Sequence, residues 1–225
     1  MTKKEERRYN ILLGAFRLFL VKEYADVTTA DIEEITGLSR GAIYYKVKNK
    51  EGLYRAVIDK FVLDFLSESL HNSISVSEET PFWDFIMSDL ELIRQRMERM
   101  KAANAESSST QFVNLLSSAY FHYEGFEEKF KELETNISDL WIEYCRRGIE
   151  AGELKKDLDL NLVISTFRSL YYGDSFCLSM IGMELDIEKL KRKYSLLYNT
   201  IYCCPLKLFL SKKSGLDSSH GIQPF

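Results

Sequence analysis

The sequence predicts an all-α protein with a small N-terminal head and a larger helical body. Only three prolines occur among 225 residues, and 45 % of the residues are hydrophobic. Few helix breakers, together with abundant Leu, Glu, Lys and Ile, favour helices along the whole chain. No apolar run reaches the roughly 18 residues that a membrane span needs, and the charged N-terminus has no signal-peptide pattern. We therefore expect a cytoplasmic protein.

The charge is divided unevenly between the two parts of the chain. Residues 1–60 contain 12 Lys and Arg against 9 Asp and Glu, a net charge of +3. The rest contains 18 against 25, a net charge of −7. A basic head on an acidic body indicates that the head meets a polyanion.

The first predicted helix of the head covers residues 9–22. Its apolar side chains recur at helical spacing and share one face. These are Ile11, Ala15, Leu18 and Phe19. The basic residues Lys3, Lys4, Arg7 and Arg8 precede this pattern.

The next three helices of the head are predicted from capping residues. Thr28 can cap a second helix, and Asp31 lies three residues later, where a reciprocal cap needs it. Gly37 can end this helix because glycine tolerates the left-handed conformation. Ser39 then caps a short third helix, and Asn49 caps a fourth. Residues 28–47 therefore read as a helix-turn-helix, whose second helix can enter a DNA major groove.

One hydrophobic centre is expected to hold these short helices together. It is predicted to consist of Phe19, Ile32, Ile35, Leu38, Ile43 and Val47. This assignment leaves the cationic residues between positions 40 and 50 on the outer side.

Longer helices are predicted for the body, about nine helices in the whole chain. They cover residues 53–71, 82–103, 111–123, 127–151, 159–183 and 186–204. A polar stretch at 73–80 ends at Pro81, which suits the first position of a helix. Residues 105–110 form a Ser-rich loop, and residues 212–225 form a tail that we expect to be disordered.

The head resembles the tetracycline-repressor (TetR) family of bacterial transcriptional regulators. Beside the first-helix residues, the matching positions are Thr28, Asp31, Ile32, Gly37, Leu38, Ser39, Gly41, Ile43, Tyr44, Val47, Asn49, Lys50, Glu51 and Leu53. Glu33 departs from the pattern and puts a negative charge near the motif. The resemblance implies a DNA-binding domain over residues 1–52 and an effector-binding and dimerisation domain over residues 53–211.

Nine residues are candidates for contact with double-stranded DNA. They are Thr28, Ser39, Arg40, Gly41, Tyr44, Tyr45, Lys46, Lys48 and Lys50. Cations that engage phosphates release condensed counterions, and tyrosine hydroxyls can donate to phosphate oxygens. Arg40 is the best base reader, since a guanidinium can bridge two acceptors of guanine. The alternatives are a core role for Tyr44, a solvated Lys48, and phosphate contact alone for Arg40.

The resemblance implies that the last two long helices form a four-helix interface in a homodimer. The candidate interface residues are Ile164, Phe167, Tyr171, Leu178, Leu190, Tyr194, Leu197, Tyr198 and Ile201. The alternative is that these stripes pack only inside one subunit.

The resemblance also implies a pocket for a small-molecule effector, whose identity the sequence does not give. The candidate lining residues are Trp83, Phe112, Tyr120, Tyr123, Trp141 and Tyr144. Aromatic residues at helical spacing can equally form core. Such a lining suits an apolar or aromatic effector, whereas Arg94 and Arg96 could neutralise an anionic one.

The resulting hypothesis is a repressor that binds a palindromic operator as a dimer and is released by its effector. The alternative is a DNA-binding dimer that answers to a protein partner or acts as an activator. The four cysteines lack metal-ligand spacing, and no nucleotide-binding or hydrolase motif occurs. We therefore expect no enzyme, no cofactor and no metal.

Overall fold

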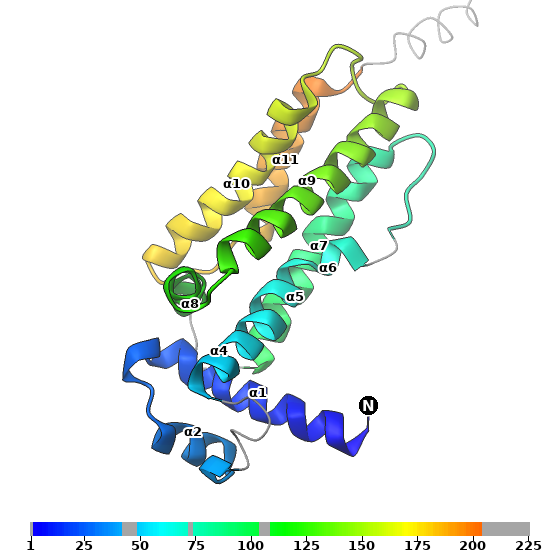
Figure 1. Ribbon diagram of the computed structural model, residues 1–225. Coiled ribbons are helices and arrows are strands. Elements are labelled where there is room, and N and C mark those ends of the chain that lie inside the picture. Colours follow the sequence, from blue (N-terminus) through cyan, green and yellow to red (C-terminus); the bar gives the residue numbers. More distant parts are fainter. Residues whose placement is uncertain (1, 42–48, 72–73, 104–108, 204–225) are drawn as a thin grey trace, which may run out of the picture.

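The computed structural model of the protein describes residues 2–41, 49–71, 74–103 and 109–203. The head lies at one end of a long helical body, and all named elements within these ranges are helical (Figure 1). None of the helices formed by these residues is long and apolar enough to cross a membrane.

The first helix, α1 (Lys3–Val21), begins six residues earlier than its apolar pattern indicates. Thr2 caps it, and the side chains of Thr2 and Glu5 form a reciprocal capping box. The basic residues predicted to precede the helix therefore lie in its first two turns. The threonine and the glutamate three residues later are the signal for this start.

The second helix, α2 (Thr29–Thr36), follows a short 3₁₀ turn at Tyr24–Asp26. Its predicted cap is confirmed, because Thr28 and Asp31 form a capping box. Gly37 ends it with φ of 64°, in the left-handed region where glycine is favoured. The prediction for Gly37 is thus also confirmed.

Asn49 caps α4 (Lys50–Ile58), as predicted, by accepting the Gly52 N–H at 2.7 Å. The chain then continues through a π-helical segment (Asp59–Leu63) into α5 (Asp64–Leu66) and α6 (Glu68–His71). The head is therefore joined to the body by an almost continuous run of helix.

The body consists of five longer helices whose bounds lie close to the predicted ones. They are α7 (Pro81–Ala103), α8 (Ser109–His122), α9 (Phe126–Glu150), α10 (Leu160–Met180) and α11 (Ile187–Ile201). Pro81 occupies the first position of α7, as predicted. The predicted tail at 212–225 lies outside the described residues.

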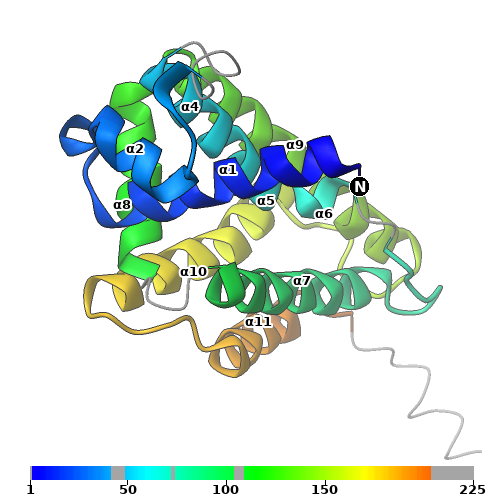
Figure 2. The same ribbon diagram turned by 90° about the horizontal axis from the view of Figure 1, so that it is seen from below.

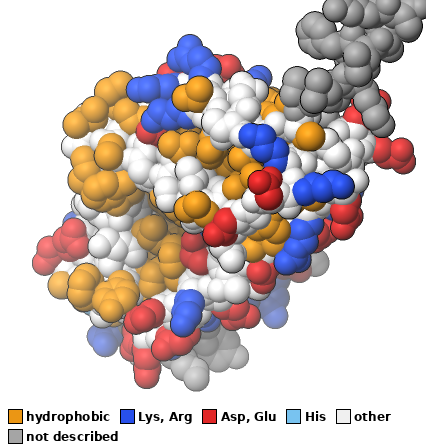
Figure 3. Space-filling view, turned by 90° about the horizontal axis from the view of Figure 1, so that it is seen from above, with side chains coloured by type: hydrophobic (Ala, Val, Ile, Leu, Met, Phe, Trp, Pro, Cys, Tyr) orange, Lys and Arg blue, Asp and Glu red, His pale blue; other side chains and the backbone are white. Residues whose placement is uncertain are grey.

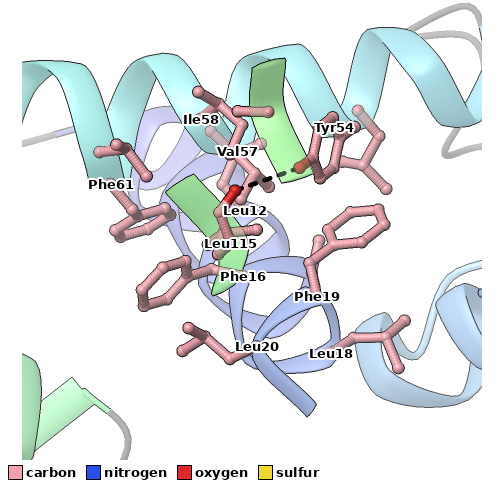
Figure 4. Packing of buried hydrophobic residues seen from close by; sticks show 14 of the residues in the cluster. Leu12, Phe16, Leu18, Phe19, Leu20, Tyr54, Val57, Ile58, Phe61 and Leu115 are labelled. Atoms are coloured by element: carbon pink, nitrogen blue, oxygen red, sulfur yellow. Dashed lines mark hydrogen bonds between the residues drawn. The ribbon is translucent and has the colours of Figure 1, made fainter. Parts of the chain in front are cut away.

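Two apolar clusters form the core. The first joins α1, α2 and α4 to α8, and Figure 4 shows Leu115 of α8 among Phe16, Phe19 and Tyr54. The second joins α7, α9, α10 and α11. α8 lies beside α1 in both views of the ribbon (Figures 1 and 2). The core of the head thus extends past residue 52 into α4 and α8.

The predicted hydrophobic centre of the head is only partly right. Phe19 and Ile32 are buried and Leu38 is half-buried, but Ile35 is 46 % exposed. A Cβ atom at Gly14 would lie 3.2 Å from the Ile35 carbonyl oxygen, so the α2 backbone approaches α1 directly at this point. This close approach leaves the Ile35 side chain at the rim. The remaining two members of the predicted centre, Ile43 and Val47, lie outside the described residues.

Candidate nucleic-acid interface and body cavity

The N-terminus of α2 is fixed by a cluster of short polar contacts. Thr28 Oγ1 and the Thr28 backbone N–H each donate to Asp31 Oδ2 at 2.8 Å. Lys22, at the end of α1, donates to Asp31 Oδ1 at 2.6 Å. Chiefly this bond from Lys22 lowers the pKa of Asp31 to about 2. Exposed Thr28 is therefore held rigidly at the point where a phosphate contact is predicted.

The start of the predicted third helix lies on the surface, where Ser39, Arg40 and Gly41 are all exposed. Glu33 Oε1 accepts the Arg40 backbone N–H at 2.5 Å, so its charge stabilises the first turn of this helix. A Cβ atom at Gly41 would meet no atom of the described residues within 4 Å, so their packing does not require glycine there. Close approach of an external surface remains the predicted reason for it.

Four predicted contact residues, Tyr44, Tyr45, Lys46 and Lys48, lie outside the described residues. Their contacts with DNA remain predictions.

Lys50 has a role inside the head that the sequence did not reveal. Its Nζ donates to the carbonyl oxygens of Val27 at 2.7 Å and of Ala25 at 3.3 Å. The same ammonium lies 4.5 Å from the centroid of the Tyr24 ring. Lys50 thus ties the start of α4 to the connection that leads into α2.

The head also contacts the body through groups that are far apart in the sequence. The Tyr24 ring stacks on His122 with 4.5 Å between centroids. Tyr54 Oη donates to the Leu115 carbonyl oxygen at 3.5 Å, as drawn in Figure 4. Arg55 pairs with Glu124 at 3.1 Å. These contacts place α8 directly against the head, and no local sequence pattern predicts them.

A cavity of about 160 Å³ lies in the body between α5, α7, α8 and α10. Phe112 is the one residue of the predicted pocket that lines it. The complete lining is Phe65, Leu66, Ile93, Arg96, Met97, Met100, Lys101, Phe112, Val113, Tyr171, Ser175, Glu184 and Leu185.

The other predicted pocket residues lie elsewhere, so the prediction is wrong for them as lining of this cavity. Trp83 packs on Tyr198, Tyr144 stacks on Phe85, and Tyr123 donates to Asp59. Trp141 borders a separate cavity of only 30 Å³. Tyr120 is 57 % exposed. Helical periodicity marks aromatic residues that face a neighbouring helix, whether the space between them is filled or open.

The two arginines that could neutralise an anion have different surroundings. Arg94 lies on the surface and pairs with Glu91 and Glu98. Arg96 is only 6 % exposed and lines the 160 Å³ cavity. No group of three or more potential metal ligands occurs among the residues that the structure describes.

The predicted dimer residues lie mainly inside the subunit. Six of them are buried: Ile164, Phe167, Leu190, Tyr194, Tyr198 and Ile201. Tyr171, Leu178 and Leu197 are half-buried. The buried six pack in the second apolar cluster, so the prediction that they face a second subunit is wrong.

The other faces of α10 and α11 carry the exposed apolar side chains. They include Leu162, Phe176, Met180 and Leu196. Figure 3 shows hydrophobic side chains gathered in patches on one face of the molecule, among acidic and basic ones. An interface between subunits would have to use such exposed side chains.

Comparisons with known proteins agree with this architecture. The family model described as "Bacterial regulatory proteins, tetR family" matches residues 11–57. The regulator TtgR of Pseudomonas putida is 43 % identical over 60 residues, which cover 26 % of this chain and only 29 % of TtgR. The repressor AcnR of Corynebacterium diphtheriae is 20 % identical over 200 residues, covering 89 % of this chain and 94 % of AcnR.

Solved structures extend the likeness to the whole fold. The crystal structure of a TetR transcription regulator from Haloarcula marismortui is 18 % identical, with a TM-score of 0.67. It covers 88 % of this chain and 99 % of that regulator. At this identity, the likeness concerns the fold alone. Together, these findings identify residues 11–57 as a match to the tetR family of bacterial regulatory proteins and show that the fold of the whole chain is similar to that of a TetR regulator.

Proposed function

We propose that the protein is a transcriptional repressor, not an enzyme, which binds a palindromic DNA operator as a dimer and is released by a small-molecule effector. The observation that carries this proposal is the capped α2, the left-handed Gly37 and the exposed start of the next helix, all inside residues 11–57 that match the family model. The relatives AcnR and IcaR, the latter from Staphylococcus epidermidis, are named as a repressor and a negative regulator.

Charge supports DNA as the partner of the head. The segment from Arg40 to Lys50 contains Arg40, Lys46 and Lys48 without a carboxylate among them, whereas its fourth cation, Lys50, binds carbonyls inside the head. Among the described residues, the carboxylate of Glu33 is tied to the start of this segment, because it accepts the Arg40 backbone N–H. A surface of this kind can approach phosphates without a repelling carboxylate.

The proposed route from effector to DNA runs through α8. Phe112 and Val113, near its start, line the 160 Å³ cavity. Leu115 and Ala119, further along the same helix, and Tyr123, just past its end, belong to the core of the head. A ligand that prefers one position of α8 would therefore favour one position of the head. It can weaken DNA binding only by its differential affinity for the two states.

A pair of substitutions tests DNA recognition by the head. Selection from random duplexes supplies the operator, and fluorescence anisotropy then measures binding over a range of salt concentrations. Arg40→Ala should cost about 1–3 kcal/mol on the operator and relax its sequence preference. Equal losses on operator and random DNA would contradict base reading by Arg40.

Lys50→Ala is the matched comparison in the same head. Because Lys50 binds two carbonyls inside the head, we expect a lower melting temperature and an unchanged salt slope. A slope that falls by about one unit would instead assign Lys50 to a phosphate.

Substitutions on the exposed face of α10 and α11 test the proposed dimer. Phe176 is 53 % exposed and Leu196 is 72 % exposed. We expect Phe176→Asp combined with Leu196→Asp to convert the dimer into monomers, and so to weaken operator binding, because two heads must reach half-sites about 34–36 Å apart.

Sedimentation velocity measures the state of assembly. The control is Tyr120→Asp, an exposed aromatic residue on α8, which should leave the dimer intact. A wild-type protein that sediments as a monomer would contradict the proposed dimer.

A further inference from the structure

We infer that the 160 Å³ cavity binds a small organic monocarboxylate, whose apolar body is about the size of one aromatic ring and whose carboxylate pairs with Arg96. This inference rests on the proposed function, because it names the chemical class of the effector that the proposed repressor answers to.

The size of the cavity limits the size of the ligand. An apolar cavity of about 150 Å³ is sufficient to bind benzene. The cavity here has about 160 Å³ and takes most of its wall from apolar side chains of four helices. Met97 and Met100 contribute flexible side chains that adapt to the outline of a bound group. One ring or a short alkyl chain therefore fits, with a polar group at one end.

The polar end is defined by Arg96. Its side chain is 94 % buried, since only 6 % of the residue is exposed. Its Nε donates to the Leu92 carbonyl oxygen at a long 3.4 Å, and its guanidinium carbon lies 5.9 Å from the centroid of the Phe65 ring. A buried cation costs free energy unless an anion or several hydrogen bonds compensate it. These two weak contacts compensate Arg96 only in part.

The nearby carboxylates do not pair with Arg96. Within the described parts of the chain, no carboxylate oxygen lies within 4.0 Å of its guanidinium nitrogens. Glu184 lines the same cavity but pairs with Lys101 at 2.6 Å, and Glu134 pairs with Arg168 at 2.5 Å. Asp89 is the remaining acidic group near Arg96.

Asp89 is buried near Arg96 but does not form an ion pair with it. Its pKa is raised, since burial outweighs the attraction of Arg96 and Arg168. No oxygen of Asp89 lies within 4.0 Å of the guanidinium nitrogens of Arg96, so Asp89 compensates the charge of Arg96 only from a distance and not by a direct ion pair. An ionised ligand can supply that compensation at the cavity wall.

The charges at the cavity wall favour a ligand that carries one negative charge on a planar group. Arg96 offers parallel N–H donors that suit the two oxygens of a carboxylate. The second cation of the lining, Lys101, is already paired with Glu184 and is exposed. A dianion would bring an uncompensated charge into an apolar wall, and a neutral analogue would leave Arg96 without an anion.

Isothermal titration calorimetry of the full chain tests this inference with benzoate, hexanoate and the corresponding amides, benzamide and hexanamide. We expect at least one carboxylate to bind at least tenfold more tightly than its amide. Equal affinity of both acids and their amides, or no saturable binding of either acid up to about 10 mM, would overturn the inference. This arm uses the wild-type protein alone, so it does not depend on the folding of a variant.

Substitution of the two arginines locates the site. Arg96→Gln should lower the affinity for the carboxylate at least tenfold and abolish the preference over the amide. Arg94→Gln is the matched control on the same helix and should leave both unchanged, because Arg94 pairs with Glu91 and Glu98 on the surface. An acid preference that survives Arg96→Gln in a folded protein would overturn the assignment.

The titration contains no DNA, so its failure is distinct from failure of the proposed function. A chain that binds the acid but no duplex would keep the site and lose the proposed repressor. A chain that binds operator DNA but neither acid would lose the site and keep the proposed repressor.

Discussion

The start of α2 in the head and the start of α7 in the body both have backbone amides that donate to a carboxylate. In the head, Asp31 of α2 accepts the backbone N–H of Thr28, three residues before it. In the body, Glu153 accepts the backbone N–H groups of Phe82 and Trp83 at the start of α7, each at 2.8 Å. Asp31 is therefore a local cap, whereas Glu153 reaches its helix from about 70 residues away.

The two carboxylates also differ in their surroundings. Asp31 pairs with partly exposed Lys22 at the surface. Glu153 is only 3 % exposed and also accepts the hydroxyl of Tyr198 at 2.7 Å, which joins α11 to the same site. The comparison indicates that the local cap is worth little to global stability, whereas the distant one holds three helices of the body together.

Removal of the buried carboxylate should have the largest effect. Glu153→Ala leaves two backbone donors and one hydroxyl without their acceptor in a buried site. Since each unsatisfied buried group costs about 1–3 kcal/mol, we expect a loss of about 3–5 kcal/mol in the free energy of unfolding. Urea unfolding followed by circular dichroism measures it.

The control is Glu150→Ala, an exposed residue near the end of α9, which should change stability by less than about 0.5 kcal/mol. Similar losses for the two variants would break the contrast between buried and exposed carboxylates.

A substitution that adds bulk beside Glu153 should have an intermediate effect on the free energy of unfolding. A Cβ atom at Gly148 would lie 2.9 Å from Glu153 Oε2 and 3.0 Å from Phe82 Cβ. Gly148→Ala therefore displaces the carboxylate or the α7 backbone, and we expect a loss of about 1–3 kcal/mol.

The control is Gly173→Ala in α10, where a Cβ atom meets nothing within 4 Å in the part of the chain that the structure describes. Alanine favours the helix there, so this variant should be as stable as the wild type or more so. Equal thermal melting temperatures for both alanine variants would show that the space beside Glu153 is not tight.

Removal of the surface carboxylate of Asp31 should have the smallest effect on stability, and this effect should disappear at acid pH. The pKa of Asp31 in the folded head is about 2, below its ordinary value of 3.8. A lowered pKa contributes stability above 3.8, and this contribution is lost as the pH falls towards 2. Asp31→Asn should therefore be slightly less stable than the wild type at neutral pH and equally stable at the acid end.

Urea midpoints of both proteins across this pH range measure the difference, and added salt should reduce it because the pair with Lys22 is partly exposed. A difference that stays constant down to the lowest pH would contradict the assignment to Asp31.

Features whose partners lie within a few residues could be predicted from the sequence. The caps at Thr28 and Asn49, the end of α2 at Gly37 and the start of α7 at Pro81 are all found as predicted. Each depends on hydrogen bonds or backbone geometry within one helical turn. The long helices of the body were found for the same reason, because their apolar periodicity is a local property.

Features that depend on distant partners could not be predicted. The inward role of Lys50 requires the carbonyls of Ala25 and Val27, and Tyr24 meets His122 only after α8 has packed on the head. The apolar stripe that includes Phe167 on α10 predicts an interface, but the helices of the same subunit cover it. Periodicity shows that a face is apolar, and it does not show which neighbour buries it.

The sequence by itself determined the helical fold, the helix-turn-helix of the head and the presence of arginines that could meet an anion. Only the tertiary structure decided between Arg94 and Arg96. Two residues along a helix correspond to a rotation of about 200°, so the two side chains leave α7 in nearly opposite directions. The arrangement of α5, α8 and α10 around a cavity on one side of α7 placed Arg96 at its wall and left Arg94 among surface glutamates. That choice depends on contacts between helices, which no local pattern encodes.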